Sequence, residues 1–170
     1  MKYVVGVDIG GTSVKNGLFS DNGELLDKWE IPTRKENGGE LILKDVATAI
    51  KEELSKKSIE KDDLLGVGVG VPGPVQTDGY VSLCPNLGWR EYHPDKVLSE
   101  FLDGVPVKAG SDANVAALGE AFKGAAAGEK NVVMLTLGTG VGGGIIVDGK
   151  MVAGVHGAGG ELGHIVVNPG

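Results

Sequence analysis

Residues 4–26 read VVGVDIGGTSVKNGLFSDNGELL, and this stretch carries the strongest information about the fold. An apolar run is followed by a Gly-Gly-Thr turn, a second β-rich run, an Asp-Asn-Gly turn and a third run. Asp-Asn-Gly between apolar runs is typical of a β-hairpin, because these residues adopt the positive φ angles that tight turns need. The stretch therefore predicts three successive strands joined by two tight turns.

The same order of elements returns at residues 132–152, VVMLTLGTGVGGGIIVDGKMV, with a Gly-Thr-Gly turn and an Asp-Gly turn. Few residues are identical between the two stretches, but their strands and turns follow in the same order. The sequence therefore predicts two copies of an α/β unit that begins with three strands, the second copy being cut short. We place the boundary near Ser111, which gives a first domain over residues 1–110 and the start of a second over residues 111–170.

The rest of the chain is read from its hydrophobic periodicity and its turn residues. Ser111 and Asp112 are residue types that suit the N-cap of the helix that follows them. The expected helices are 40–57, 94–102 and 113–123, and the expected strands are 3–7, 13–19, 24–31, 64–71, 105–109, 131–137, 141–147, 150–153 and 165–167.

Composition narrows the class of protein. The chain has 170 residues, 41% of them hydrophobic, and a formal net charge of −7, so it carries no basic field for nucleic acid. One cysteine, Cys84, excludes an intrachain disulfide and fits a reducing compartment. We find neither a signal peptide nor an apolar run long enough for a membrane span, so we expect a cytoplasmic protein with no nucleic-acid or membrane partner.

The first glycine turn is a candidate phosphate-binding loop. Glycines leave backbone N–H groups free to point at an anion, as Gly10 and Gly11 would here. Thr12 adds a hydroxyl, Lys15 adds a point charge, and the carboxylate of Asp8 suits Mg²⁺ held through water. A plain β-turn with a solvent-facing lysine fits the same residues.

The second glycine turn, Gly138, Thr139 and Gly140, contains a Gly-x-Gly pattern but is followed by a strand and a hairpin turn. A dinucleotide-binding fingerprint needs a helix at that point, and the chain has no GK[ST] for a P-loop, so both readings are rejected. Two glycine hairpins at equivalent places in two units instead predict a clamp on a triphosphate across a cleft.

Three further side chains are candidates for chemistry. Asp112 begins a helix, where the helix dipole stabilises an acid, but the same position suits a general base for phosphoryl transfer. Glu161 and His164 stand three residues apart among glycines and together suit the hydroxyl groups of a sugar. His164 is also a possible zinc ligand, or the lone histidine of a surface loop.

Taken together, the motifs resemble those of the ROK sugar kinases (repressors, open reading frames, kinases), most closely the bacterial ROK glucokinases. The resemblance spans residues 5–170 and rests on DIGGT at 8–12, GVPGPV at 70–75, NLGW at 86–89, DANVAALGE at 112–120, LGTGVGGG at 137–144 and ELGH at 161–164. It implies an α/β protein with the actin/hexokinase-like (ribonuclease H-like) fold, with the small domain complete and the large domain truncated.

The resemblance also implies an activity: transfer of the γ-phosphoryl group of ATP, with Mg²⁺, to the 6-hydroxyl of a hexose, most simply glucose. By this resemblance Asp112 is the catalytic base, Glu161 and His164 bind the sugar, and Gly73 borders it. The glycine turns at 10–12 and 138–140 hold the phosphates. The matching histidine of the family also helps to ligate a structural zinc, and the resemblance implies that role for His164 only if the cysteine ligands that the family carries beyond the point matched by Gly170 are supplied.

Two departures from the family bear on these expectations. Ser111 stands where the family usually has a sugar-contacting asparagine, so the sugar affinity or preference is expected to differ. The family also continues well beyond the point matched by Gly170, with a cysteine-rich zinc motif, so we expect this chain to be the N-terminal portion of such a kinase, poorly active alone.

Other functions stay open at this stage. One is a ROK kinase for fructose, mannose or an N-acetylhexosamine, with ATP or polyphosphate as donor. Another is a non-catalytic sugar- or nucleotide-binding fragment, and a third, which we disfavour, is a sugar-sensing transcription factor. An unpaired sheet edge and exposed apolar faces predict a homo-oligomer, most simply a dimer.

Overall fold

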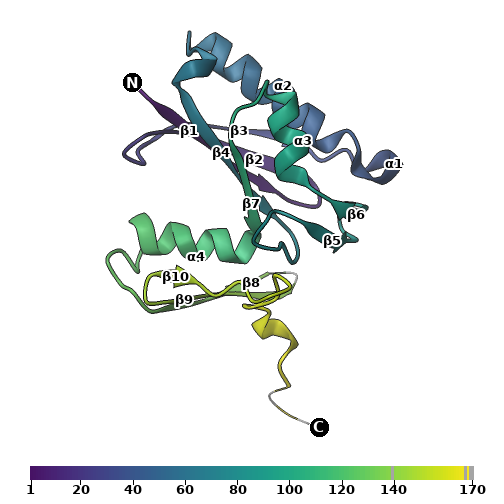
Figure 1. The fold of residues 1–170 in the computed structure, drawn as a ribbon, viewed down its shortest axis with the longest axis vertical. Helices are drawn as coiled ribbons and strands as arrows, with labels where there is room; N and C mark the ends of the chain where they lie inside the picture. The colour runs from purple at the N-terminus through teal and green to yellow at the C-terminus, as the bar shows by residue number, and fades with distance from the viewer. Residues whose placement is uncertain (139, 167, 169–170) are drawn as a thin grey trace.

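The computed structural model describes residues 1–138, 140–166 and 168, and its first unit is built on a five-stranded sheet (Figure 1). The strand order is β3-β2-β1-β4-β7. The first three strands are antiparallel neighbours, whereas β4 and β7 run parallel to β1. The bounds are β1 (Tyr3–Ile9), β2 (Ser13–Ser20), β3 (Leu25–Pro32), β4 (Leu64–Val71) and β7 (Val107–Ser111).

The core of this unit lies on one face of the sheet. Side chains alternate along β1, so Val5, Val7 and Ile9 are buried while Asp8 is exposed on the other face. Two helices that contact each other, α2 (Ile42–Lys56) and α3 (Pro94–Phe101), cover the buried face with side chains such as Ile50 and Leu98. The opposite face of β1 carries the exposed Asp8.

Four short elements complete the first unit: α1 (Glu36–Gly39), η1 (Lys61–Asp63), β5 (Val81–Cys84) and β6 (Trp89–Tyr92), the last two paired antiparallel. A close backbone contact ties α1 to the turn before β6, because a Cβ on Gly39 would meet the Leu87 carbonyl oxygen at 2.2 Å. The Trp89 indole N–H also donates to the Gly39 carbonyl over 3.3 Å. This contact holds the turn that carries Asn86.

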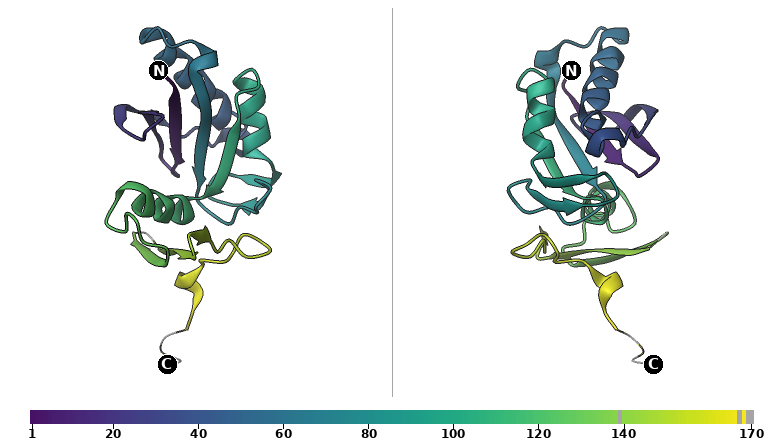
Figure 2. Two further views of the ribbon diagram at one scale, coloured as in Figure 1. Left: turned by 60° about the vertical axis from the view of Figure 1, so that its left-hand side comes forward. Right: turned by 90° about the vertical axis from the view of Figure 1, so that its right-hand side faces the viewer.

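The second unit consists of helix α4 (Asp112–Lys123) and a three-stranded antiparallel sheet in the order β10-β9-β8. Its strands are β8 (Val132–Leu137), β9 (Val141–Val147) and β10 (Lys150–Met151), followed by the 3-10 turn η2 (Leu162–His164). Helix α4 contacts β4 and β7 as well as β8 and β9, so it lies between the two sheets (Figures 1 and 2). At its far end the Phe122 ring packs against Gly23, where an added Cβ would meet it at 2.6 Å.

The predicted repeat is confirmed: β8, β9 and β10 pair as β1, β2 and β3 do. The predicted strand at 165–167 is wrong for its first two residues, and Val167 lies outside the described residues. Ile165 and Val166 have 62% and 77% of their surface exposed, and a β-branched run forms a strand only where it finds a partner and a packed face. The short α1, η1, β5 and β6 were not expected from the sequence.

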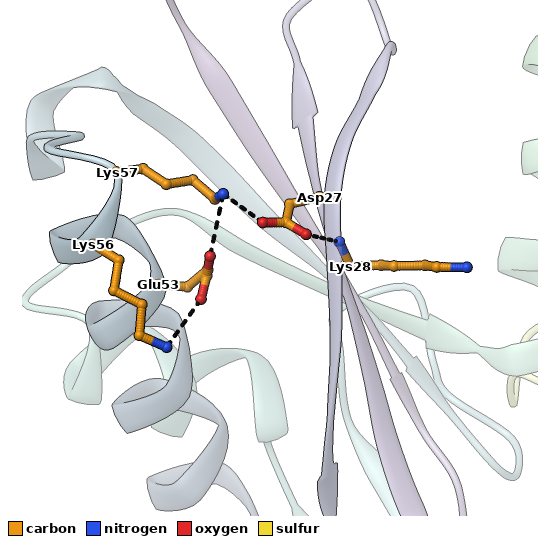
Figure 3. A network of polar contacts seen from close by, with 5 residues as sticks. All are labelled: Asp27, Lys28, Glu53, Lys56 and Lys57. Carbon is orange, nitrogen blue, oxygen red and sulfur yellow. Dashed lines mark hydrogen bonds and ion pairs between the residues drawn. The ribbon is translucent and has the colours of Figure 1, made fainter.

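Charged side chains join α2 to the edge strand β3 (Figure 3). The Lys57 ammonium pairs with Asp27 and, at 3.3 Å, with Glu53, which also pairs with Lys56 at 3.3 Å. Asp27 further accepts the Lys28 backbone N–H at 2.7 Å. The hydrogen bond from Lys57 lowers the pKa of Asp27, and the same contact raises the pKa of Lys57.

In the part of the chain that is described, no helix has the length and apolar character needed to cross a membrane.

Candidate active site

The two predicted glycine turns share one hollow of about 490 Å³. Its lining includes six predicted site residues: Asp8, Gly10, Gly11, Asp112, Gly138 and Gly140. The turns reach it because β1 and β8 each end at this place and reverse into β2 and β9. The hollow therefore joins the two units of the predicted repeat.

Each turn uses part of its hydrogen-bonding capacity to hold its own shape. Gly10 N–H donates to the Ser13 carbonyl at 2.9 Å, and Gly138 N–H donates to the Gly140 carbonyl at 2.9 Å. The amides of Gly11 and Thr12 donate none of the backbone hydrogen bonds found among the described residues. The amides available to an anion in the first turn are therefore those of Gly11 and Thr12, whereas the sequence analysis predicted this role for Gly10 and Gly11.

Thr33 fixes the first turn from outside and was not singled out from the sequence. Its backbone N–H donates to the Thr12 carbonyl at 2.9 Å, and its hydroxyl donates to the Gly10 carbonyl at 2.8 Å. The position directly follows β3, whose neighbour in the sheet is β2. The supporting role of Thr33 follows from the pairing of β3 with β2, which cannot be read from the sequence alone.

Asp112 lies where β7 ends and α4 begins. Gly70 pairs with Asp8 of β1 on one side and with Gly110 of β7 on the other, so both acids lie at the carboxyl ends of parallel strands. Ligands of open α/β sheets bind at such ends. Gly70 and Gly110 leave room for α4: a Cβ on either would lie 3.0 Å from the Val115 side chain.

The pKa of Asp112 is raised above its ordinary value. Desolvation by the surrounding protein is the main cause, and the negative charge of Asp8 adds to it. A hydrogen bond from Ala113 N–H, at 2.7 Å to Oδ1, acts in the opposite direction. The carboxylate is still open to the hollow, so it is an accessible group whose affinity for a proton is increased.

Ser111 is buried, with 5% of its surface exposed, and is the N-cap of α4. Its hydroxyl oxygen accepts the Asn114 backbone N–H at 3.5 Å. The residues that line the hollow do not include Ser111. The predicted capping role is confirmed, and the predicted sugar contact stays a prediction.

The other predicted site residues that the structure describes lie outside the lining of this hollow. Lys15 stands opposite Asp8 across the β1–β2 pairing and lines, with Asp8, a separate hollow on the sheet. Gly73 lies in the turn after β4, beside Cys84, whose thiol donates to the Pro72 carbonyl at 3.2 Å. Thr12 lies in the first turn beside the lining residues, and Thr139 lies outside the described residues.

The candidate sugar pair is formed: His164 Nε2 lies 3.8 Å from Glu161 Oε2. Both side chains are open, with 84% and 35% of their surface exposed respectively. The glycine-rich loop before them is held by backbone contacts. A Cβ on Gly157 would meet the Val75 carbonyl oxygen at 2.5 Å, and one on Gly160 would meet the Gly143 carbonyl oxygen at the same distance.

Among the lining residues that were not candidates from the sequence are Pro72, Asn86 and Thr136. Pro72 and Asn86 belong to motifs on which the family resemblance rests, but neither was given a role there. Thr136 is a polar residue in the otherwise apolar strand β8, one residue before the strand ends at the second turn. A polar residue in an apolar strand, next to a glycine turn, was the signal available for it.

A metal is not equally well accommodated by the two predicted sites. Carboxylate oxygens are the ligands that Mg²⁺ prefers, and Asp8 supplies one beside the hollow, so the residues present fit the ion. A structural zinc needs about four ligands from Cys, His or acidic side chains. The described residues contain no group of three or more such side chains that could hold a metal, so His164 and Glu161 do not by themselves make a zinc site.

Two glycine hairpins at equivalent places in a repeated unit of three strands, with a helix packed between the two sheets, are the arrangement of the actin/hexokinase-like fold. The particular family follows from the chain itself. Residues 4–170 match the ROK family, and the chain belongs to that family.

The relatives agree with this assignment. A glucokinase of Halalkalibacterium halodurans is 47% identical over 169 residues, covering 99% of this chain and 51% of that protein. The structure of a ROK hexokinase from Thermus thermophilus has a TM-score of 0.83 and 38% identity, covering 98% of this chain and 54% of that one. A ROK glucokinase from Streptomyces griseus, solved with glucose and AMPPNP, has a TM-score of 0.80 and 33% identity, with coverages of 98% and 51%. The chain thus spans about half the length of the relatives that it matches.

Proposed function

We propose that this chain carries the catalytic base and the phosphate turns of an ATP-dependent hexose kinase, with glucose as the acceptor and glucose 6-phosphate as the product. The observation that supports this most directly is the position of Asp112, in one hollow with both glycine turns. The similarity to glucokinases from other bacteria supports glucose as the sugar.

In the proposed reaction the Asp112 carboxylate accepts the proton of the sugar 6-hydroxyl. The hydroxyl oxygen forms a bond to the γ-phosphorus, and the bond from that phosphorus to the bridging oxygen of ADP breaks. The increased proton affinity of Asp112 favours this transfer, because a base is most effective when its pKa approaches the working pH. The amides of Gly11 and Thr12 are placed to stabilise phosphate charge.

The remaining assignments describe how the substrates are held. Asp8 would hold Mg²⁺ through water, and the ion when bound would neutralise phosphate charge. Lys15 would add positive charge beside Asp8. We assign Glu161 and His164 to the sugar hydroxyls because their polar atoms lie together on an open loop, with Gly73 and Ser111 at the border of the sugar site.

We further propose that residues 1–110 and 111–170 belong to different domains, which close on the substrates and exclude water. The division is supported by the end of the five-stranded sheet at Ser111 and the start of α4 at Asp112. The expected location is the cytoplasm, consistent with one buried cysteine and no disulfide.

We also propose that the chain self-associates through β8, the edge strand of its sheet. Val133, Leu135 and Leu137 on one face of β8 have 66%, 57% and 82% of their surface exposed. Apolar surface on an unpaired edge favours association. A dimer or larger species is expected in sedimentation, and a monodisperse monomer would contradict it.

The test of the function is sugar-dependent ADP release from Mg-ATP across a panel of hexoses, for the parent and for Asp112→Asn. A positioned base contributes about 10²–10⁴-fold, so the variant should lose that factor in kcat while its sugar affinity, measured by calorimetry, changes little. Asp148→Asn makes the same chemical change in the exposed β9–β10 turn and should retain the parent rate.

Chain length is the second variable of this test. If the folded 170-residue chain shows no turnover, the same panel and variants are run on a version extended to the length of its relatives. An extended Asp112→Asn enzyme that turns over at the parent rate would overturn the assignment of the base. An extended parent that phosphorylates no hexose would overturn the proposed function.

A further inference from the structure

Asn114 has a buried side-chain oxygen without a hydrogen-bond partner. Only 7% of the residue surface is exposed, and its Oδ1 has no partner among the described residues. The residue lies in the first turn of α4, two positions after Asp112, and its backbone N–H is taken by the N-cap Ser111. The backbone of Asn114 is therefore satisfied, and the unpaired group is the carboxamide.

The unpaired oxygen faces the loop that leads to the candidate sugar pair. A Cβ built on Gly160 would lie 3.2 Å from Asn114 Oδ1, so the oxygen is directly beside this glycine. Gly160 immediately precedes Glu161, and its backbone N–H donates none of the backbone hydrogen bonds found in the described ranges. The Oδ1 of Asn114, an acceptor without a donor, and the N–H of Gly160, a donor without an acceptor among the backbone groups described, thus lie on residues that are in contact in space.

A buried and unpaired amide oxygen is unfavourable, because it has lost its water and gained no partner. A leucine side chain has the same branched shape and no polar atom to leave unpaired, so it would avoid that penalty. The asparagine therefore brings no evident advantage to folding in this arrangement. Its chemistry is explained if a small shift of the adjacent loop in the free protein brings the Gly160 N–H to this oxygen.

We propose that Asn114 is a positioning residue of the sugar site: its Oδ1 accepts a hydrogen bond from the Gly160 N–H and so fixes Glu161 relative to Asp112. The base and the sugar pair would then be held by one helical turn, since Asp112 and Asn114 share it. The link to the sugar rests on the proposed function, whereas the link between Asn114 and the loop does not.

The first arm of the test measures the loop without any substrate. Hydrogen exchange of a peptide covering residues 157–161 is followed in the parent, in Asn114→Leu and in Leu118→Ala. The control, Leu118, is on the same helix and has 45% of its surface exposed. One hydrogen bond is worth roughly two- to tenfold in an equilibrium, so loop exchange should accelerate by that factor in Asn114→Leu only. An unchanged loop in Asn114→Leu would overturn the proposal, whether or not the protein is a kinase.

The second arm separates positioning from folding, in the extended version of the protein if the 170-residue chain does not turn over. Asn114→Leu should melt at or above the parent temperature, since it removes an unpaired polar group, while its sugar KM rises two- to tenfold and its ATP KM does not change. Sugar and ATP KM values that rise together with a lower melting temperature would show a merely structural residue.

A third variant guards against misfolding of Asn114→Leu. Asn114→Asp retains an oxygen acceptor at the same place, and the first turn of a helix favours a carboxylate there. It should restore slow loop exchange and a sugar KM close to the parent value. Fast exchange in both variants would show that the acceptor is not what holds the loop. A parent that phosphorylates no hexose would defeat the proposed function and leave the exchange result to decide the role of Asn114.

Discussion

Gly160→Ala is the substitution whose effect follows most directly from the geometry. The added Cβ would lie 2.5 Å from the Gly143 carbonyl oxygen, whereas ordinary contact begins at 3.4 Å, so the loop and β9 must separate by the difference, 0.9 Å. The clashing atom belongs to the backbone of a paired strand and cannot rotate away. The shift is therefore passed to the loop, whose next residue is Glu161.

A misplacement of about 1 Å near reacting groups lowers a rate by about 10²-fold. We therefore expect Gly160→Ala to lose about that factor in kcat/KM for the sugar, and overpacking should also lower the free energy of unfolding by about 1–3 kcal/mol. The assays are sugar-dependent ADP release, in the extended version if the 170-residue chain shows no turnover, and thermal unfolding.

The matched control is Gly119→Ala, which adds the same methyl group to α4 where nothing lies within 4 Å. Alanine replaces glycine in an exposed helix with a gain of about 1 kcal/mol, so this variant should melt slightly higher and retain the parent activity. The reasoning is refuted if Gly160→Ala keeps the parent kcat/KM, or if Gly119→Ala loses as much activity as Gly160→Ala.

Three further predictions concern the charged groups. Because the base acts only when deprotonated, kcat/KM should fall as the pH drops through the raised pKa of Asp112. Asp8→Asn removes the negative neighbour and should move this fall in kcat/KM to lower pH. A pH profile that does not move would contradict the contribution of Asp8 to the pKa of Asp112. The same raised pKa means that Asp112 holds its proton more tightly in the folded than in the unfolded protein, so ionised Asp112 destabilises the fold at neutral pH. Asp112→Asn should therefore melt at a higher temperature than the parent at neutral pH. This difference should vanish below pH 3.8, the pKa of Asp112 in the unfolded chain. The pKa shift of Asp27 has the opposite effect on stability. Its lowered pKa stabilises the fold above pH 3.8, the pKa of Asp27 in the unfolded chain, and this contribution disappears as the pH falls through the folded pKa. In thermal unfolding, Asp27→Asn should melt slightly below the parent at neutral pH and at the same temperature as the parent in acid.

The sequence predicted the parts of the fold that depend on local pattern. Both three-stranded stretches were predicted from turn residues and β-branched runs, α2 from its helical periodicity and α4 from its N-cap residues. The short strands β5 and β6 escaped because four residues give too little periodicity, and α1 escaped because its helical turn contains glycines and positive φ angles. These segments are set by tertiary contacts such as that between Gly39 and Leu87.

The candidate site was predicted in its chemistry but not in its spatial order. The two glycine turns and Asp112 do meet in one hollow, as equivalent places in a repeated unit require. The sequence could not show that the Gly10 and Gly138 amides are used within their own turns, that Thr33 holds the first turn, or that Asn86 reaches the hollow. The amide hydrogen bonds depend on the exact backbone geometry of each turn, and the places of Thr33 and Asn86 depend on contacts between distant segments; one sequence holds no signal for either.

The place of Asp112 at the very first residue of α4 has a mechanical consequence. A helix of 12 residues is about 18 Å long, so a rotation of about 10° about its first turn would move its last turn by about 3 Å and its first residue hardly at all. The carboxylate thus lies at the fixed end of such a rotation, and Phe122, packed on Gly23, lies in the last turn of α4, which would move most. A probe of motion between the two sheets belongs at Phe122, because the base would remain almost still while the molecule moved around it.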